Sequence, residues 1–223
     1  MHQLINKKII IFFFLFVLFA SLNNKNLNYL EFLKIKKINI SGLDNESSSK
    51  LLKELSLFKG EGLLFFDKFQ IKEILNSNEM IEKFSIFKKY PSTLEIKIKK
   101  VKILAHTKKD NANFFIGSNG KLIKIKDIEQ RVPFIFGNFE VEDFLKLEKK
   151  IKKSKLETHQ IKNLFFFKSG RWDIEMLNGI LIKLPRKKIK ESLDLSVTIL
   201  NDNNFEDIRI IDLRQRDQVI ING

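Results

Sequence analysis

The sequence predicts an α+β protein with a short apolar N-terminal segment, a small mixed unit and a second unit rich in β-strands. Three observations support this prediction. Apolar and polar side chains alternate strictly in several stretches, most clearly over Leu94–Lys99, as in a strand with one buried face. Apolar residues recur at spacings of three and four over Glu140–Ser154 and Lys187–Asn201, as in amphipathic helices. Asn-Gly pairs at residues 119–120 and 178–179 favour tight turns between strands.

Length and composition narrow the possible classes of protein. The chain has 223 residues, of which 43% are hydrophobic, enough for two small domains and an anchor. Its formal net charge of +14 raises nucleic acid or an anionic membrane as a partner. The basic residues are mostly lysines scattered over polar faces, so we interpret them as solvated surface and expect no nucleic-acid partner. Cysteine is absent, which excludes disulfides and thiolate chemistry.

The N-terminal segment is apolar over Ile9–Leu22, which as a helix would span about 21 Å of the roughly 30 Å hydrocarbon core. A signal peptide cleaved near Ala20 and an uncleaved anchor that continues into Asn23–Leu33 both fit this pattern. We favour an anchor over residues 9–30, because bulky Leu18 and Phe19 make a poor cleavage site. The anchor residues would be Ile9, Phe12, Phe16, Phe19 and Leu22.

The charges around this segment predict its orientation. Residues 1–8 carry Lys7 and Lys8 and no acid, whereas Lys25 and Glu31 cancel beyond the segment. The bias places residues 1–8 in the cytoplasm and the body outside the inner membrane. After Leu33 no apolar run approaches membrane length, so we expect a single pass.

The first unit, expected over residues 35–102, shows the order strand, helix, helix, strand, strand. Pro91 suits the second position of a turn between the last two strands. The alternation changes phase at Lys100, which predicts a bulge or a strand end. The expected pieces are a strand around Ile38 and Ile40, helices over Ser47–Leu57 and Phe69–Leu75, and strands over Lys83–Lys89 and Leu94–Lys99.

The second unit, expected over residues 103–223, combines short strands with two helices on a mostly antiparallel sheet. Its clearest hairpin runs from Arg171 to Leu184, where two alternating runs flank an Asn-Gly turn. The other expected pieces are a hairpin over Ile116–Lys126, strands over Val132–Gly137, Ile161–Phe167, Ile208–Leu213 and Gln218–Ile221, and helices over Glu140–Ser154 and Lys187–Asn201.

No arrangement of residues indicates catalysis. His2, His106 and His159 lie in unrelated segments without a metal-ligand spacing. Gly60-Glu61-Gly62 lacks the Lys-Ser/Thr of a nucleotide-binding loop. We therefore expect no enzyme, no catalytic residue, no metal, no cofactor and no small-molecule substrate.

Open strand edges are the remaining candidate for function, because unpaired N–H and C=O groups can accept a strand from a partner. We expect the C-terminal strands to provide this edge, since no further strand follows them. Arg209, Arg214 and Arg216 beside them offer planar donors to acidic partner residues.

The first unit resembles a POTRA (polypeptide-transport-associated) domain in its element order. Its motifs, Ile38-x-Ile40-x-Gly42, Gly60-x-Gly62-Leu63-Leu64-x-Phe66-Asp67 and Tyr90-Pro91-x-Thr93-Leu94, resemble those of the FtsQ/DivIB family of bacterial cell-division proteins. That family usually has Asn where this chain has Gly62, and Phe where it has Leu64. Arg171–Ile174, Asn178–Ile180 and Ile211–Arg214 resemble its β domain, so the likeness covers essentially the whole chain.

The resemblance implies a non-enzymatic scaffold subunit of the divisome that bridges early and late division proteins and helps control septal cell-wall assembly. It implies a single-pass inner-membrane protein with a periplasmic body and binding of FtsB and FtsL through the last strands. FtsK, FtsW and FtsI are further implied partners. The implied partner-binding residues are Arg209, Ile211, Asp212, Arg214, Gln215, Arg216, Asp217, Gln218 and Val219.

Three other interpretations stay open on the sequence. One is a POTRA chaperone for outer-membrane or secreted proteins, although such proteins usually carry repeated modules or a barrel. Another is a secreted cationic binding protein released near Ala20. The third is a periplasmic enzyme of unrecognised type.

Overall fold

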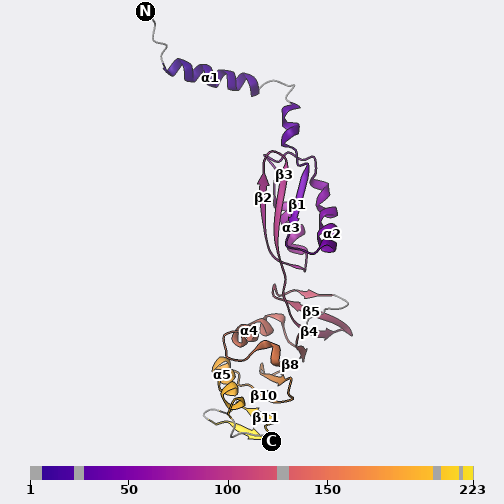
Figure 1. Ribbon diagram of the computed structural model, residues 1–223, viewed down its shortest axis with the longest axis vertical. Coiled ribbons are helices and arrows are strands. Elements are labelled where there is room, and N and C mark those ends of the chain that lie inside the picture. The colour runs from indigo at the N-terminus through magenta and orange to yellow at the C-terminus, as the bar shows by residue number, and fades with distance from the viewer. Residues whose placement is uncertain (1–6, 23–27, 125–130, 203–206, 216–217, 223) are drawn as a thin grey trace, which may run out of the picture. The chain divides into compact units, whose positions relative to one another are not determined.

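The computed structural model describes residues 7–22, 28–124, 131–202, 207–215 and 218–222. The chain divides into two compact units (Figure 1). The first unit holds residues 1–74 and 84–98, and the second holds residues 75–83 and 99–223. The expected domain boundary between residues 102 and 103 stays a prediction. A division of the chain by contacts between residues and a division by its strands need not fall at the same residue.

Helix α1 (Lys7–Leu22) is followed by a short 3₁₀ helix, η1 (Asn28–Leu33). Large apolar side chains of α1 are exposed, including Ile9, Phe12, Phe16 and Phe19. Among the residues that the structure describes, no helix has both the length and the apolar character needed to cross a membrane.

The elements of the first unit are β1 (Lys37–Ser41), α2 (Asn45–Leu55), η2 (Ser56–Phe58), α3 (Phe69–Ser77), β2 (Ile81–Lys89) and β3 (Thr93–Lys100), although residues 75–77, 81–83 and 99–100 of these elements group with the second unit by contacts. Its three strands lie in the order β1-β3-β2, with β1 parallel to β3. Helix α2 begins two residues earlier than expected, because the carboxylate of Asp44 accepts a hydrogen bond from the backbone N–H of Ser47 and caps the helix. The predicted order of elements is confirmed.

Apolar side chains from both helices and the sheet form the core of the first unit. Leu55, Ile71, Leu94 and Ile96 are each fully buried. Beside this core, Gly42 ends β1 with a φ of +98°, and a Cβ at this position would lie 1.8 Å from the carbonyl oxygen of Ile98. Only glycine fits there, since a side chain would be both strained and in collision.

Among its described residues, the second unit holds one nine-stranded sheet and the α-helices α4 and α5. Its elements are β4 (Ile103–Lys109), β5 (Ala112–Gly117), β6 (Leu122–Ile123), β7 (Phe134–Phe136), α4 (Val141–Ile151), η3 (Thr158–Gln160), β8 (Ile161–Phe166), β9 (Trp172–Met176), β10 (Leu181–Lys183), α5 (Ile189–Leu200), β11 (Ile210–Asp212) and β12 (Ile220–Asn222).

The strand order in this sheet is β12-β11-β10-β9-β8-β7-β4-β5-β6. Five of the described pairings are antiparallel, and three are parallel: β4 with β7, β7 with β8, and β10 with β11. The expectation of a mostly antiparallel sheet holds, but the parallel pairs were not foreseen. The β7–β8 and β10–β11 pairs are parallel because α4 and α5 each connect two strands that run in the same direction, as a crossover helix does.

Strand β4 was also missed by sequence analysis. Apolar and polar residues do not alternate cleanly over Ile103–Lys109, and the pairing with β5 shifts register between Ile103 and Ala105. The phase change at Lys100 coincides with the end of β3. The expected strand end is therefore confirmed, and β4 starts three residues later in a new sheet.

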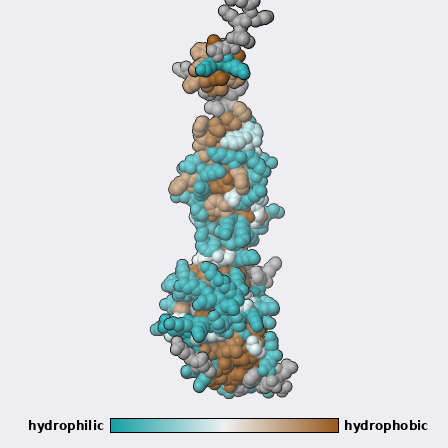
Figure 2. Space-filling model, turned by 90° about the vertical axis from the view of Figure 1, so that its left-hand side faces the viewer, coloured by the Kyte–Doolittle hydropathy of each residue, from teal (hydrophilic) through white to brown (hydrophobic). Residues whose placement is uncertain are grey.

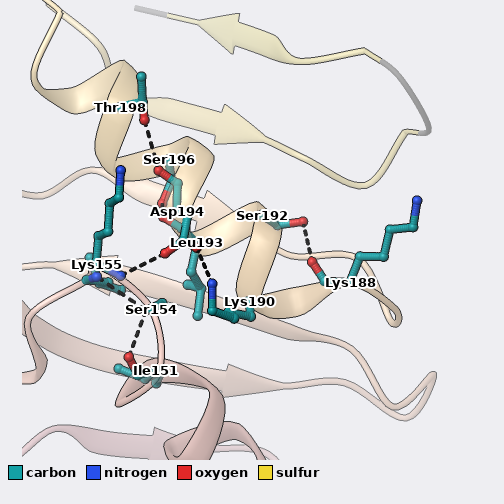
Figure 3. A network of polar contacts seen from close by, with 11 residues as sticks. Ile151, Ser154, Lys155, Lys188, Lys190, Ser192, Leu193, Asp194, Ser196 and Thr198 are labelled. Carbon is teal, nitrogen blue, oxygen red and sulfur yellow. Dashed lines mark hydrogen bonds and ion pairs between the residues drawn. The ribbon is translucent and has the colours of Figure 1, made fainter.

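Helices α4 and α5 lie next to the strands of the second unit (Figure 1) and share one apolar core with the sheet. Phe144 and Leu147 of α4 and Leu193 of α5 are buried in the same cluster as Ile135, Leu164 and Ile174 of the strands. Figure 3 shows how α5 is fixed on its outer side: Asp194 accepts hydrogen bonds from the backbone N–H of Lys155 at 2.7 Å and from Nζ of Lys190 at 2.6 Å. These bonds lower the pKa of Asp194, with the Lys190 hydrogen bond as the largest cause.

Candidate functional site

Strand β12 lies at one end of the nine-stranded sheet, and among the described strands it pairs with β11 alone. Ile211 faces Ile221, and Asp212 faces Ile220, in this antiparallel pair. Half of the Ile220 side chain is exposed, at 52%. An edge strand of this kind presents backbone N–H and C=O groups and an apolar side chain to a partner strand.

A groove of about 910 Å³ lies beside this edge. Leu195 on α5, Leu213 after β11 and Val219 before β12 supply its apolar lining. Leu195 and Val219 are exposed, and Figure 2 shows an apolar patch at the end of the second unit that carries the C-terminal strands. Apolar grooves of this size are a usual place for a partner's side chains to bind.

The rim of the groove is basic. Arg186, Lys187 and Lys188 precede α5, Arg214 follows β11, and Glu191 is the acid among the lining residues. A partner segment with acidic residues next to apolar ones would match both the rim and the lining.

Asp212 and Arg214 form an ion pair at the site. Nε of Arg214 lies 2.8 and 2.9 Å from the two carboxylate oxygens of Asp212, and Nη2 lies 2.5 Å from Oδ2. The Asp212 carboxylate also accepts the backbone N–H of Arg214 at 3.1 Å. These hydrogen bonds hold the pKa of Asp212 below its usual value. The pair therefore fixes the chain as it leaves β11 toward the groove.

Charged residues continue from Asp212 across the neighbouring strands. Lys183 on β10 pairs in register with Asp212 on one side and with Asp173 of β9 on the other. Asp173 is buried, and the loss of solvent raises its pKa even though Nε of Arg171 lies 3.2 Å away. The alternating signs of adjacent side chains favour this strand register.

The predicted partner-binding residues differ in how far their side chains are exposed to solvent. Arg209, Arg214, Gln215, Gln218 and Val219 are exposed. Asp212 is largely buried in its ion pair, and Ile211 is fully buried, which leaves its side chain in the core and not on a partner surface. Arg216 and Asp217 lie outside the described residues.

The sequence did not predict that α5 lines the groove. The helical pattern of Ile189, Leu193 and Val197 identified the core face of α5, and Leu193 is fully buried as expected. Leu195 lies off that stripe and is 42% exposed. A leucine on the polar side of an amphipathic helix was the signal available in the sequence.

The predicted anchor residues Ile9, Phe12, Phe16, Phe19 and Leu22 all lie on α1. Of the histidines, His106 packs against the rings of Phe115 and Phe134, and burial lowers its pKa. Within the described part of the chain, no group of three or more His, Cys, Asp or Glu side chains could hold a metal ion.

Comparison with protein families supports the description of both units. Residues 33–100 match the model of the POTRA domain, FtsQ-type, so the chain is a POTRA-domain protein. Residues 105–214 match the model of the C-terminal domain of the cell division protein FtsQ/DivIB. Together the two models cover most of the chain, in the order that the family has, and the chain belongs to the FtsQ/DivIB family of cell-division proteins.

Individual relatives are distant. The chain is 26% identical over 195 residues to the cell division protein FtsQ of Rickettsia bellii, covering 84% of this chain and 72% of the relative. It is 32% identical over 127 residues to the cell division protein DivIB of Clostridium botulinum, covering 56% of this chain and 48% of the relative. The solved extracytoplasmic domain of DivIB from Geobacillus stearothermophilus aligns with a TM-score of 0.35 and 12% identity, over 48% of this chain and 98% of that one.

Proposed function

We propose that this chain is a non-enzymatic assembly subunit of the bacterial divisome that holds another division protein on the edge of β12. In this role it bridges early and late division proteins and helps control septal cell-wall assembly by the enzymes among them. The observation that carries the proposal is the position of β12 at the end of the sheet, with the half-exposed Ile220 beside an apolar groove.

Strand addition requires free main-chain groups on an edge strand and a place for the side chains of the added strand, and both are available here. Main-chain hydrogen bonds to β12 would supply affinity, and alternate side chains of the added strand would supply specificity. One of those side chains would enter the groove, which Leu195 and Val219 line.

The resemblance to the FtsQ/DivIB family points to FtsB and FtsL as the partners at this edge. The basic rim formed by Arg186, Lys187 and Arg214 predicts acidic residues in the bound segment. Arg214 keeps 40% of its side chain exposed while it binds Asp212, so its remaining donors are accessible to a partner carboxylate.

We further propose that residues 9–30 anchor the chain in the inner membrane in a single pass, with residues 1–8 in the cytoplasm and the body in the periplasm. The exposed apolar side chains of α1 and the lysines at its start support this part of the proposal. Anchoring would raise the effective concentration of β12 for other anchored subunits, FtsW and FtsI included.

Hydrogen exchange of the full-length chain in detergent, with and without purified FtsB–FtsL, tests this function. We expect the partners to slow exchange of the amides in Ile220–Asn222 and to leave the buried β8–β9 pair unchanged. Binding that protects α5 but leaves the amides of β12 unaffected would contradict strand addition. Absence of binding, with the chain folded, would contradict the assignment of FtsB and FtsL.

A further inference from the structure

We propose that the end of the first unit into which the N-terminal segment leads binds the surface of an anionic lipid bilayer, with Phe65 and Leu57 entering the headgroup region. This inference rests on the membrane anchoring proposed above. It assigns a lipid-binding surface to the loop between α2 and α3, separate from the β12 edge.

Two apolar side chains on this loop are almost fully exposed. Leu57 is 81% exposed and Phe65 is 86% exposed, compared with Phe58 and Phe66, their neighbours in sequence, at 6% each. The rings of Phe58 and Phe66 meet edge to face at 5.7 Å. The loop thus buries one residue of each adjacent pair and holds the other in solvent, at the cost of an unfavourable contact with water.

Backbone hydrogen bonds fix this loop to the incoming chain. The N–H of Ile35 donates to the carbonyl of Glu61 at 2.8 Å, and the N–H of Gly60 donates to the carbonyl of Ile35 at 2.9 Å. The N–H of Leu63 donates to the carbonyl of Leu33 at 2.7 Å. The exposed apolar residues therefore project from a structured loop that lies against the segment arriving from α1.

The exposed side chain of Phe32, on η1, belongs to the same end of the unit. Figure 2 shows apolar surface where the chain enters this unit. Phe32 lies two residues before Lys34, which pairs with Gly62 in an isolated antiparallel bridge. Tyr90, also exposed, lies in the turn whose Ser92 carbonyl accepts the N–H of Lys36.

Several lysines lie at the same end of the unit as these apolar residues. Lys36, Lys37 and Lys59 are exposed at this end, and Nζ of Lys88 donates to the carbonyl of Leu64 at 3.0 Å. The acids nearby are Glu31, which binds Lys34 at 2.8 Å, together with Glu61 and Asp67. The basic residues outnumber the acidic ones, so the surface fits negatively charged headgroups around inserted apolar side chains.

The position of this surface in the chain favours a bilayer over a soluble partner. Glu31 and Phe32 follow the proposed anchor, residues 9–30, directly in the sequence. The anchor would therefore hold Phe32, and the loop bonded to its neighbours, close to the lipid headgroups. Aromatic and lysine side chains are the residues that membrane proteins use at that depth.

Tryptophan fluorescence of the full-length chain tests the inference. Trp172 is the chain's one tryptophan, so a Trp172→Phe background allows a new tryptophan to report alone. Phe65→Trp would be compared with Asn45→Trp, which lies beyond the opposite end of β1. Both variants would be reconstituted in phosphatidylethanolamine–phosphatidylglycerol vesicles with and without brominated acyl chains, and flotation would report anchoring.

We expect the tryptophan at position 65 to emit at shorter wavelength than the one at position 45 and to lose most of its intensity to brominated lipid. The tryptophan at position 45 should keep the emission of an exposed side chain. If the chain floats with vesicles but the tryptophan at position 65 is not quenched, lipid binding by this loop is refuted and the anchor stands.

A blue shift without quenching would mean that the loop contacts protein, and it would also refute the inference. A chain that does not float would overturn the anchor and, with it, the lipid surface, but would leave the β12 proposal intact. Circular dichroism of each variant, compared with the Trp172→Phe chain, would show that the comparison is between folded proteins.

Discussion

The two sheets treat their edges differently. In the three-stranded sheet, β2 is a nine-residue edge strand that carries lysines. Lys83 and Lys89 are exposed on it, and Nζ of Lys68 donates to the backbone carbonyl of Ile86 at 2.7 Å. In the second unit, β12 is a three-residue edge, Ile220-Ile221-Asn222, without a lysine. Charged residues discourage strand pairing. The long edge therefore carries charged residues that the short edge lacks, and the short edge is the one proposed above to bind a partner.

The largest effect should come from giving β12 the protection that β2 has. We expect Ile220→Lys to weaken binding of FtsB–FtsL by about tenfold or more, because it places a charge against the added strand and removes an apolar contact. The matched control is Ser85→Lys, at an exposed position of β2. Isothermal titration with both variants would make the comparison, and equal losses from the two would contradict a special role for β12.

The converse change should open the β2 edge. Lys68→Met frees the carbonyl of Ile86, and Lys83→Val removes an exposed charge from the strand. We expect the double variant to self-associate at concentrations where the wild-type chain is monodisperse in detergent. Analytical ultracentrifugation would show this, and an unchanged sedimentation profile would mean that these lysines do not protect the edge.

A smaller effect is expected from the groove. Leu195→Ser should weaken partner binding by roughly three- to tenfold, because it removes an apolar wall without entering the core. Leu193→Ala, on the buried face of the same helix, should instead lower the free energy of unfolding by about 2–5 kcal/mol. Chemical denaturation would measure the stability of each variant, and titration with FtsB–FtsL would measure its partner binding. A large stability loss from Leu195→Ser would contradict the assignment of Leu195 to the groove.

The smallest effect concerns the ion pair beside the edge. Arg214 lowers the pKa of Asp212 in the folded chain, so the pair stabilises the fold above the unfolded-state pKa of about 4 and loses this contribution as pH falls below it. Asp212→Asn should therefore cost about 1 kcal/mol near pH 7 and less near pH 3, where the carboxylate begins to be protonated. Denaturant titrations at the two pH values would check this, and a cost independent of pH would assign it to packing.

The sequence predicts the secondary-structure elements of the first unit more accurately than those of the second. In the first unit each element carried its own signal, and the order from β1 to β3 was predicted with ends within a few residues. In the second unit β4 was missed, since its register shift near Ala105 interrupts the alternation that identifies a strand. Strand order was also beyond reach, because pairings such as β4 with β7 join segments far apart in sequence.

The candidate site was predicted in part. The C-terminal strands and Arg214 were identified from the sequence, and the structure places them at the sheet edge and the groove. The burial of Ile211 and the contribution of Leu195 were not, because each depends on which side of a strand or helix faces a neighbour that sequence analysis did not position.

The sequence by itself determined the local elements, the family and the absence of cysteine chemistry, because periodicity, turn residues and short motifs are properties of neighbouring residues. Only the tertiary structure decided the strand order that places β12 next to β11, and that α5 lines a groove beside these strands. The same holds for Leu57 and Phe65, which stay in solvent while Phe58 and Phe66 are buried. The physical reason is that burial depends on the residues that the fold brings together from distant parts of the chain.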